Sequence, residues 1–123
     1  MKIFKIREDV FKTEPLFILD CNWDKFSKYI KKNYNIEIEE DNDQCGTVVT
    51  LKRSPWRIVW TDKLNRNTLL HELFHLVTRI CQDKGVPIIA HHPNGNCGDE
   101  TAAYLFEFFS RNALKKLDRY KRK

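Results

Sequence analysis

Apolar residues occur in short runs at four places in the first half of the chain and at helical spacing in three other segments. Four of the runs predict β-strands or extended segments: KIFKI at 2–6, LFILD at 16–20, TVVTL at 47–51 and WRIVWT at 56–61. Because only KRSP separates the last two, they predict a hairpin. Trp56 and Trp60 share one face of its second strand, where we expect them in the core; a binding platform is the alternative. NIEIEE alternates like an exposed strand, and the turn residues DNDQCG follow it.

Three segments predict helices. In the first, at 22–34, apolar residues fall on one face and lysines on the other. The second runs from about 67 to 84 and ends at Gly85, because glycine just past a helix is a common terminator. The third runs from about Asp99 to near the C-terminus. This order predicts a single α+β domain over residues 1–123, with a short antiparallel sheet and the second helix packed on the third.

Composition and charge narrow the class of protein. Of the 123 residues, 41% are hydrophobic and 32% are charged, which favours a globular chain over a disordered one. No run approaches the roughly 18 apolar residues of a membrane span, and charges interrupt the first ten positions, so no signal peptide is predicted. We therefore expect a cytoplasmic protein with reduced cysteines.

The last nine residues contribute much of the net charge of +5. A solvated helix end explains them, and nucleic acid or an acidic protein is the alternative partner.

The helix predicted at 67–84 carries the sequence HELFH. On a helical wheel, His71 and His75 share a narrow polar stripe, and Glu72 borders it. The opposite apolar arc consists of Leu69, Leu70, Leu73, Phe74, Leu76, Val77, Ile80 and Cys81. Two imidazoles four residues apart can bind one zinc ion about 2 Å from each nitrogen, and the glutamate can then act on a water as general base. A core helix with structural histidines is the alternative, but it would more often place them within the apolar arc.

A catalytic zinc usually has three protein ligands and one water. The extended motif HExxHxxGxxH is absent, because Thr78 and Cys81 occupy its last two positions. The downstream candidates for the third ligand are His91, His92, Cys97, Asp99, Glu100 and Glu107. Acidic residues are common at helix N-termini for electrostatic reasons alone, but with HELFH upstream we favour Glu100. Tyr104, one turn later, would hydrogen-bond the reacting carbonyl or support Glu100; a tyrosine at a helix interface is the alternative.

HELFH followed by DETAAYLFEFF resembles the minimal gluzincin metallopeptidases, especially the small HExxH proteins of phages and prophages. It is more distantly similar to ImmA/IrrE-like and SprT-like domains. The resemblance covers roughly residues 56–110. It implies a zincin-like fold, a zinc cofactor and Glu100 as the third ligand. It also implies a strand just before the active helix, along which a substrate peptide pairs, and WRIVWT occupies that place.

We therefore expect a zinc-dependent metallopeptidase that acts on a peptide or protein. His71, His75 and Glu100 hold the metal, Glu72 transfers the proton, and Tyr104 assists. A zinc-stabilised binding or regulatory protein is the first alternative, since it would keep the ligands without needing Glu72 as a base. A nucleic-acid-associated peptidase or binder is the second, and it predicts that lysines and arginines gather around the cleft.

Overall fold

A computed structural model describes residues 1–38, 44–86 and 99–122 of the chain. The elements are β1 (Lys2–Lys5), β2 (Leu16–Leu19), α1 (Trp23–Tyr34), β3 (Gly46–Thr50), β4 (Arg57–Thr61), α2 (Arg66–Asp83) and α3 (Asp99–Lys121). The predicted α+β class and the predicted helices are confirmed. Residues 35–38 form no strand, so the exposed strand predicted for NIEIEE is wrong at these positions, and the rest of that segment lies outside the described residues.

The four strands form one mixed sheet in the order β1-β2-β4-β3. β1 pairs with β2 and β3 pairs with β4 in antiparallel fashion, which confirms the predicted hairpin. β2 and β4 are parallel, with Phe17 opposite Val59, so the prediction of an antiparallel sheet is wrong at its centre. The reason is a crossover: the chain leaves β2, forms α1 and β3, and returns so that β4 runs in the direction of β2.

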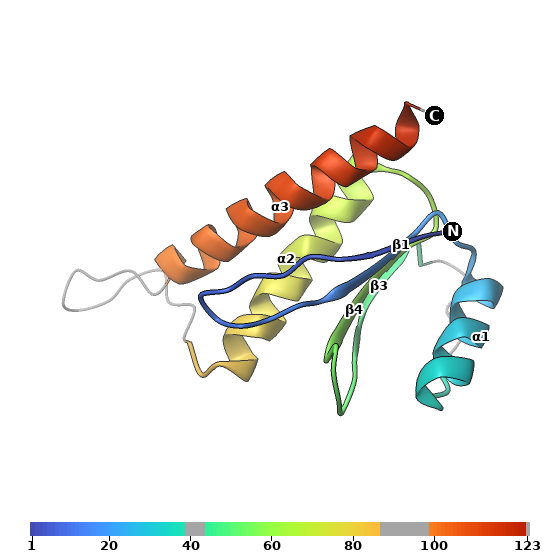
Figure 1. Cartoon of the computed structure of the whole chain (residues 1–123), viewed down its shortest axis with the longest axis horizontal. Coiled ribbons are helices and arrows are strands. Elements are labelled where there is room, and N and C mark those ends of the chain that lie inside the picture. Colours follow the sequence, from blue (N-terminus) through green and yellow to red (C-terminus); the bar gives the residue numbers. More distant parts are fainter. Residues whose placement is uncertain (39–43, 87–98, 123) are drawn as a thin grey trace.

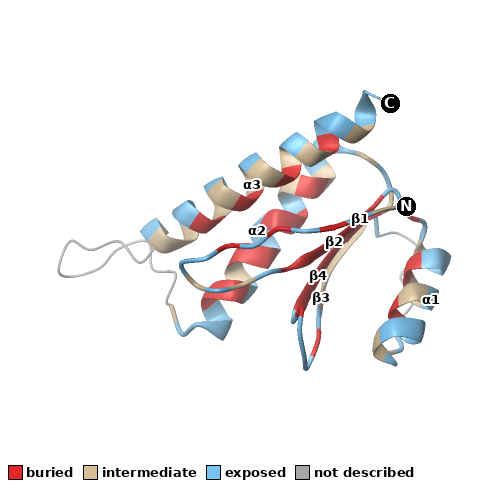
Figure 2. Cartoon of the chain, in the orientation of Figure 1, coloured by how far each residue is buried: buried red, intermediate tan, exposed pale blue. Residues whose placement is uncertain are grey.

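The sheet separates two helical layers (Figure 1), with α1 on one face and α2 and α3 on the other. β2 and β4 are buried along their whole length, because both of their faces are covered. Alternate residues of β4 point to opposite layers: Val59 contacts the α2–α3 side, and Ile58 and Trp60 contact the α1 side. Figure 2 shows the buried stripe of α2 facing the sheet.

The two tryptophans around β4 have different environments. Trp60 stacks on Phe26 of α1 with ring centroids 5.1 Å apart, and its indole nitrogen donates to the Cys21 carbonyl at 2.7 Å. It belongs to the core, as predicted. Trp56 is 57% exposed, so its assignment to the core is wrong. It lies in the turn before β4 with a φ of 66°, and its side chain therefore does not follow the alternation of the strand.

α2 begins after Asn65, whose side chain caps the first turn, and ends before Gly85, which has a φ of 68°. Phe74, predicted in the apolar arc, is instead 63% exposed and belongs to neither core cluster.

The buried residues of α3 are spaced four apart and pack in the same cluster as the buried residues of α2: Leu105, Phe109, Ala113 and Leu117. This confirms that the HELFH helix packs on the C-terminal helix. In the described ranges, no helix is long and apolar enough to cross a membrane.

Candidate metal centre

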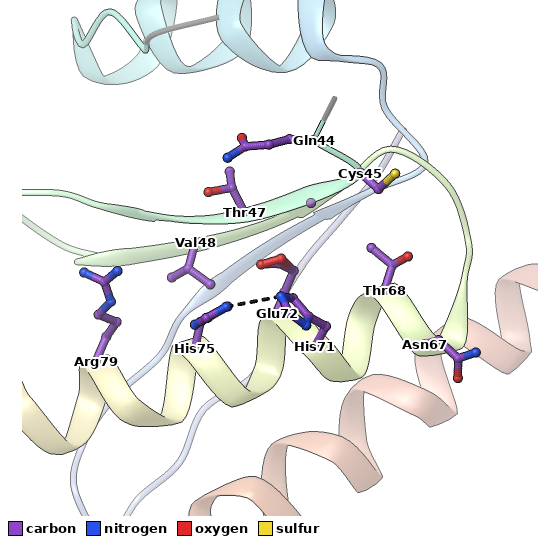
Figure 3. Close-up of a pocket in the computed structure, with 11 residues that line it drawn as sticks. Gln44, Cys45, Thr47, Val48, Asn67, Thr68, His71, Glu72, His75 and Arg79 are labelled. Carbon is purple, nitrogen blue, oxygen red and sulfur yellow. Dashed lines mark hydrogen bonds between the residues drawn. The ribbon is translucent and has the colours of Figure 1, made fainter. Parts of the chain in front are cut away.

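α2 turns its histidines toward β3, the edge strand of the sheet (Figure 3). The Nε2 atoms of His71 and His75 are 3.2 Å apart. One ligand atom each from His71, Glu72 and His75 lies within 4.8 Å of the other two. Across residues 1–38, 44–86 and 99–122, this is the one group of three potential ligands that come so close together.

The spacing of the two imidazoles suits a tetrahedral metal. Two nitrogens that each lie about 2.0–2.1 Å from a zinc ion, at a tetrahedral angle, are roughly 3.3–3.4 Å from one another. The observed 3.2 Å differs from this value by a few tenths of an ångström at most. A hydrogen bond between two neutral imidazoles would have a similar length. The separation of the two nitrogens is therefore compatible with one bound ion after a movement of a few tenths of an ångström, and without an ion it is compatible with a hydrogen bond between the rings.

Glu72 lies between α2 and the sheet and is only 5% exposed. Its side chain packs over Gly46 of β3, where a Cβ atom would be 2.8 Å from the Glu72 Cγ and 2.9 Å from the Trp60 carbonyl oxygen. A side chain larger than that of glycine at position 46 would therefore clash with Glu72 and with β4. Burial raises the pKa of the Glu72 carboxyl, and the charge of His71 opposes this effect. A buried carboxyl next to two imidazoles is the arrangement expected of a proton acceptor beside a metal.

A hollow of about 610 Å³ opens between β3 and α2, and the histidines and Glu72 line it. Cys45 and Thr47 border it on the strand side, and Thr68 and Arg79 border it on the helix side (Figure 3). Sequence reasoning did not identify Gly46, Cys45, Thr47 or Arg79 as part of the site. For Arg79 a signal existed, because it continues the spacing of four from His75. The sequence contains no comparable signal for Cys45, Gly46 and Thr47, because their position beside α2 depends on how β3 pairs with β4.

Glu100 and Tyr104 border a different hollow from the one that the two histidines line. Glu100 is exposed and borders a different hollow, together with Val10, Phe11 and Tyr104. The Tyr104 hydroxyl donates to Glu8 Oε1 at 3.0 Å, which ties α3 to the turn between β1 and β2. Neither side chain borders the hollow of the histidines. The assignments of Glu100 and Tyr104 to the metal centre stay predictions.

Most of the other candidates for the third ligand lie outside the part of the chain that the structure describes. His91, His92 and Cys97 lie outside the described residues, as does the side chain of Asp99. Glu107 forms an exposed ion pair with Arg111 at 3.9 Å. Cys21, Cys45 and Cys81 are free thiols, and Cys45 is the exposed one.

The strand beside the histidines is not the predicted one. β4, which contains most of WRIVWT, is hydrogen-bonded on both edges, to β2 and to β3. It has no edge left for a peptide, so the prediction of a pairing strand at WRIVWT is wrong. β3 is the outer strand of the sheet and borders the hollow. The strand edge next to the histidines therefore belongs to Gly46–Thr50.

Comparisons with protein-family models, with curated proteins and with solved structures give no match to this chain. The resemblance to the minimal gluzincins therefore rests on HELFH and DETAAYLFEFF alone. The first of these segments forms the group of His71, Glu72 and His75. The second forms the start of α3, away from that group.

Proposed function

We propose that this chain is a zinc-dependent peptidase of the minimal gluzincin type. The proposal is carried by the convergence of the His71 and His75 Nε2 atoms, 3.2 Å apart, beside the buried carboxyl of Glu72. His71 and His75 would hold the ion. When bound, zinc polarises a scissile carbonyl and lowers the pKa of a water molecule.

Glu72 is the general base of this proposal. Its carboxyl borders the hollow, where a water molecule can reach it. Burial raises its pKa, which brings its proton affinity closer to what proton transfer near neutral pH requires. Glu72 takes a proton from the attacking water and gives it to the nitrogen of the leaving amine.

The substrate would bind along β3. This strand pairs with β4 along one edge, no described strand pairs with its other edge, and it borders the hollow of the histidines. An extended peptide that adds to a sheet edge gains backbone hydrogen bonds regardless of its sequence. Such a peptide would pass the histidines and Glu72 and would reach Arg79 at the far end of the hollow.

The third ligand is proposed as Glu100, on the strength of the resemblance. Cys45 is the alternative that the hollow adds, because a thiolate is a good zinc ligand and Cys45 already borders the site. Measuring zinc affinity in Glu100→Gln and Cys45→Ser separates the two. Only the substitution of the true ligand weakens zinc binding strongly, and equal small effects would leave neither as a ligand.

The experiment for the proposed function is cleavage of an unbiased peptide library by the zinc-loaded chain, with products identified by mass spectrometry. His71→Ala should abolish both zinc binding and cleavage. Glu107→Gln is the matched control, since Glu107 is an exposed glutamate paired with Arg111 on α3. Cleavage that survives His71→Ala at the wild-type rate would come from another source and would contradict the proposal.

A zinc-stabilised binding protein is the second candidate. The observation that favours it is that two imidazoles and one carboxyl converge on α2, whereas Glu100 and Tyr104 lie at a different hollow. Such a protein needs its histidines to fold around zinc but has no need of a proton acceptor. Zinc would then raise the melting temperature, and no peptide in the library would be cut.

A further inference from the structure

A second hollow, of about 550 Å³, lies away from the metal centre and shares no lining residue with it. Three segments form it: the turn between β1 and β2, the turn between β3 and β4, and the end of α2. These segments meet at one end of the sheet (Figure 1). Its size is within the range of ligand-binding pockets.

Trp56 is the prominent side chain of this hollow. It is 57% exposed, although its neighbours Pro55 and Arg57 are both buried. Its φ of 66° places a bulky residue in the left-handed region, which is costly for any residue with a large side chain. The turn holds it there through hydrogen bonds from the Trp56 nitrogen to the Arg53 carbonyl, 2.8 Å, and from the Leu51 nitrogen to the Trp56 carbonyl, 2.7 Å. The turn therefore holds the indole ring in solvent although the backbone conformation of Trp56 is unfavourable.

Trp56 is not alone among the residues of this hollow in having a left-handed backbone conformation. Within the described ranges, four residues other than glycine have positive φ: Lys12, Asp20, Asn35 and Trp56. Aspartate and asparagine tolerate this conformation through local hydrogen bonds. The two that residue type does not explain, Lys12 and Trp56, both border the same hollow. Backbone strain of this kind is concentrated at functional sites.

Cationic side chains outnumber carboxylates around the indole, although Arg7 is paired with Asp9 at 2.7 Å. Arg7, Lys12, Arg57 and Lys84 border the hollow, against the carboxylates of Glu14 and Asp83. Asp83 is already bound by Arg57, through Arg57 Nε at 3.0 Å and a second short contact. In the part of the chain that the structure describes, Lys12 and Lys84 form no ion pair.

An exposed aromatic face beside unpaired lysines matches one ligand chemistry in particular. A nucleotide offers a base that stacks on the indole and a phosphate that binds an ammonium group. An acidic peptide would use the lysines and leave the indole unused, and an apolar peptide would do the reverse. We propose that this hollow binds single-stranded nucleic acid, with a base stacked on Trp56 and the flanking phosphates bound by Lys12 and Lys84. This binding is independent of the metal centre.

The test is titration of the full chain with a fluorescein-labelled oligothymidine, followed by fluorescence anisotropy at several salt concentrations. Trp56→Ala should weaken binding about tenfold or more, and Trp56→Phe should weaken it less, because a smaller aromatic ring still stacks. Lys12→Ala with Lys84→Ala should reduce the slope of log K against log salt by about 0.7 per lysine. The control is Lys28→Ala with Lys32→Ala, two exposed lysines on α1, on the opposite face of the sheet.

Several outcomes would overturn the proposal. One is equal affinity of Trp56→Ala and wild type, given that circular dichroism shows both to be folded. Another is an equal loss in the two lysine pairs, which would indicate general electrostatic attraction by a basic chain. Thymidine monophosphate that competes as well as the oligomer, per nucleotide, would assign the hollow to a free nucleotide. Displacement by polyglutamate with no dependence on Trp56 would assign it to acidic peptides.

Discussion

Gly46→Ala tests how the metal centre is built. The added Cβ would lie 2.8 Å from the Glu72 Cγ, 2.9 Å from the Trp60 carbonyl oxygen and 3.1 Å from Glu72 Oε2. The carbonyl belongs to β4, which is fixed by neighbours on both edges, so relief must come from Glu72 or from separation of the strands. Overpacking of this kind costs about 1–3 kcal/mol. For a chain of this size, that cost lowers the melting temperature by roughly 4–12 °C.

Thermal unfolding monitored by circular dichroism measures the effect, and a double-mutant cycle assigns it. Glu72→Ala removes the Cγ that the new methyl group meets, so Gly46→Ala should cost less in that background. Gly85→Ala is the control: Gly85 has a φ of 68° and no atom near its missing Cβ, so it tests backbone strain without contact. Its cost should not depend on Glu72. If Gly46→Ala costs nothing, or costs the same with and without Glu72, then Glu72 does not pack on β3 as described.

Two further predictions concern buried carboxyls. Because burial raises the folded-state pKa of Glu72, the folded protein binds its proton more tightly than the unfolded chain does, and stability falls as pH rises through that range. Metal-free Glu72→Gln should therefore melt higher than wild type at pH 8, and the difference should shrink as pH falls toward 4; a constant difference would contradict the burial of this group. Tyr104→Phe removes the hydroxyl that donates to the fully buried Glu8, and should cost about 1–3 kcal/mol in denaturant unfolding without changing zinc affinity. A loss of zinc affinity would instead place Tyr104 in the metal centre.

The helices and HELFH could be predicted because their signals are local. Spacing of apolar residues located the helices, and the i, i+4 histidines share one side of α2 whatever surrounds it. The strand expected beside the histidines was WRIVWT. That prediction was wrong because β4 pairs with β2 across the crossover, which leaves β3 at the edge of the sheet.

The errors have a common physical origin in contacts between distant segments. Trp56 and Trp60 have the spacing of one strand face, but a left-handed residue at the start of the segment turns Trp56 outward. Phe74 has the spacing of the apolar arc, but neither the sheet nor α3 covers that side of α2. The assignment of Glu100 as third ligand stays a prediction, and Glu100 borders the same hollow as Tyr104. No local pattern in the sequence reports these long-range arrangements.

The central claim is that Glu72 is a proton acceptor beside a metal held by His71 and His75. The most direct measurement is the rate of peptide cleavage by wild type and by Glu72→Gln at equal zinc content, verified by elemental analysis. The amide has nearly the size of the carboxylate but cannot take a proton from water, so the rate should fall by roughly 10²–10⁴-fold while zinc stays bound. A Glu72→Gln variant that binds zinc and cleaves at the wild-type rate would contradict the proposed mechanism.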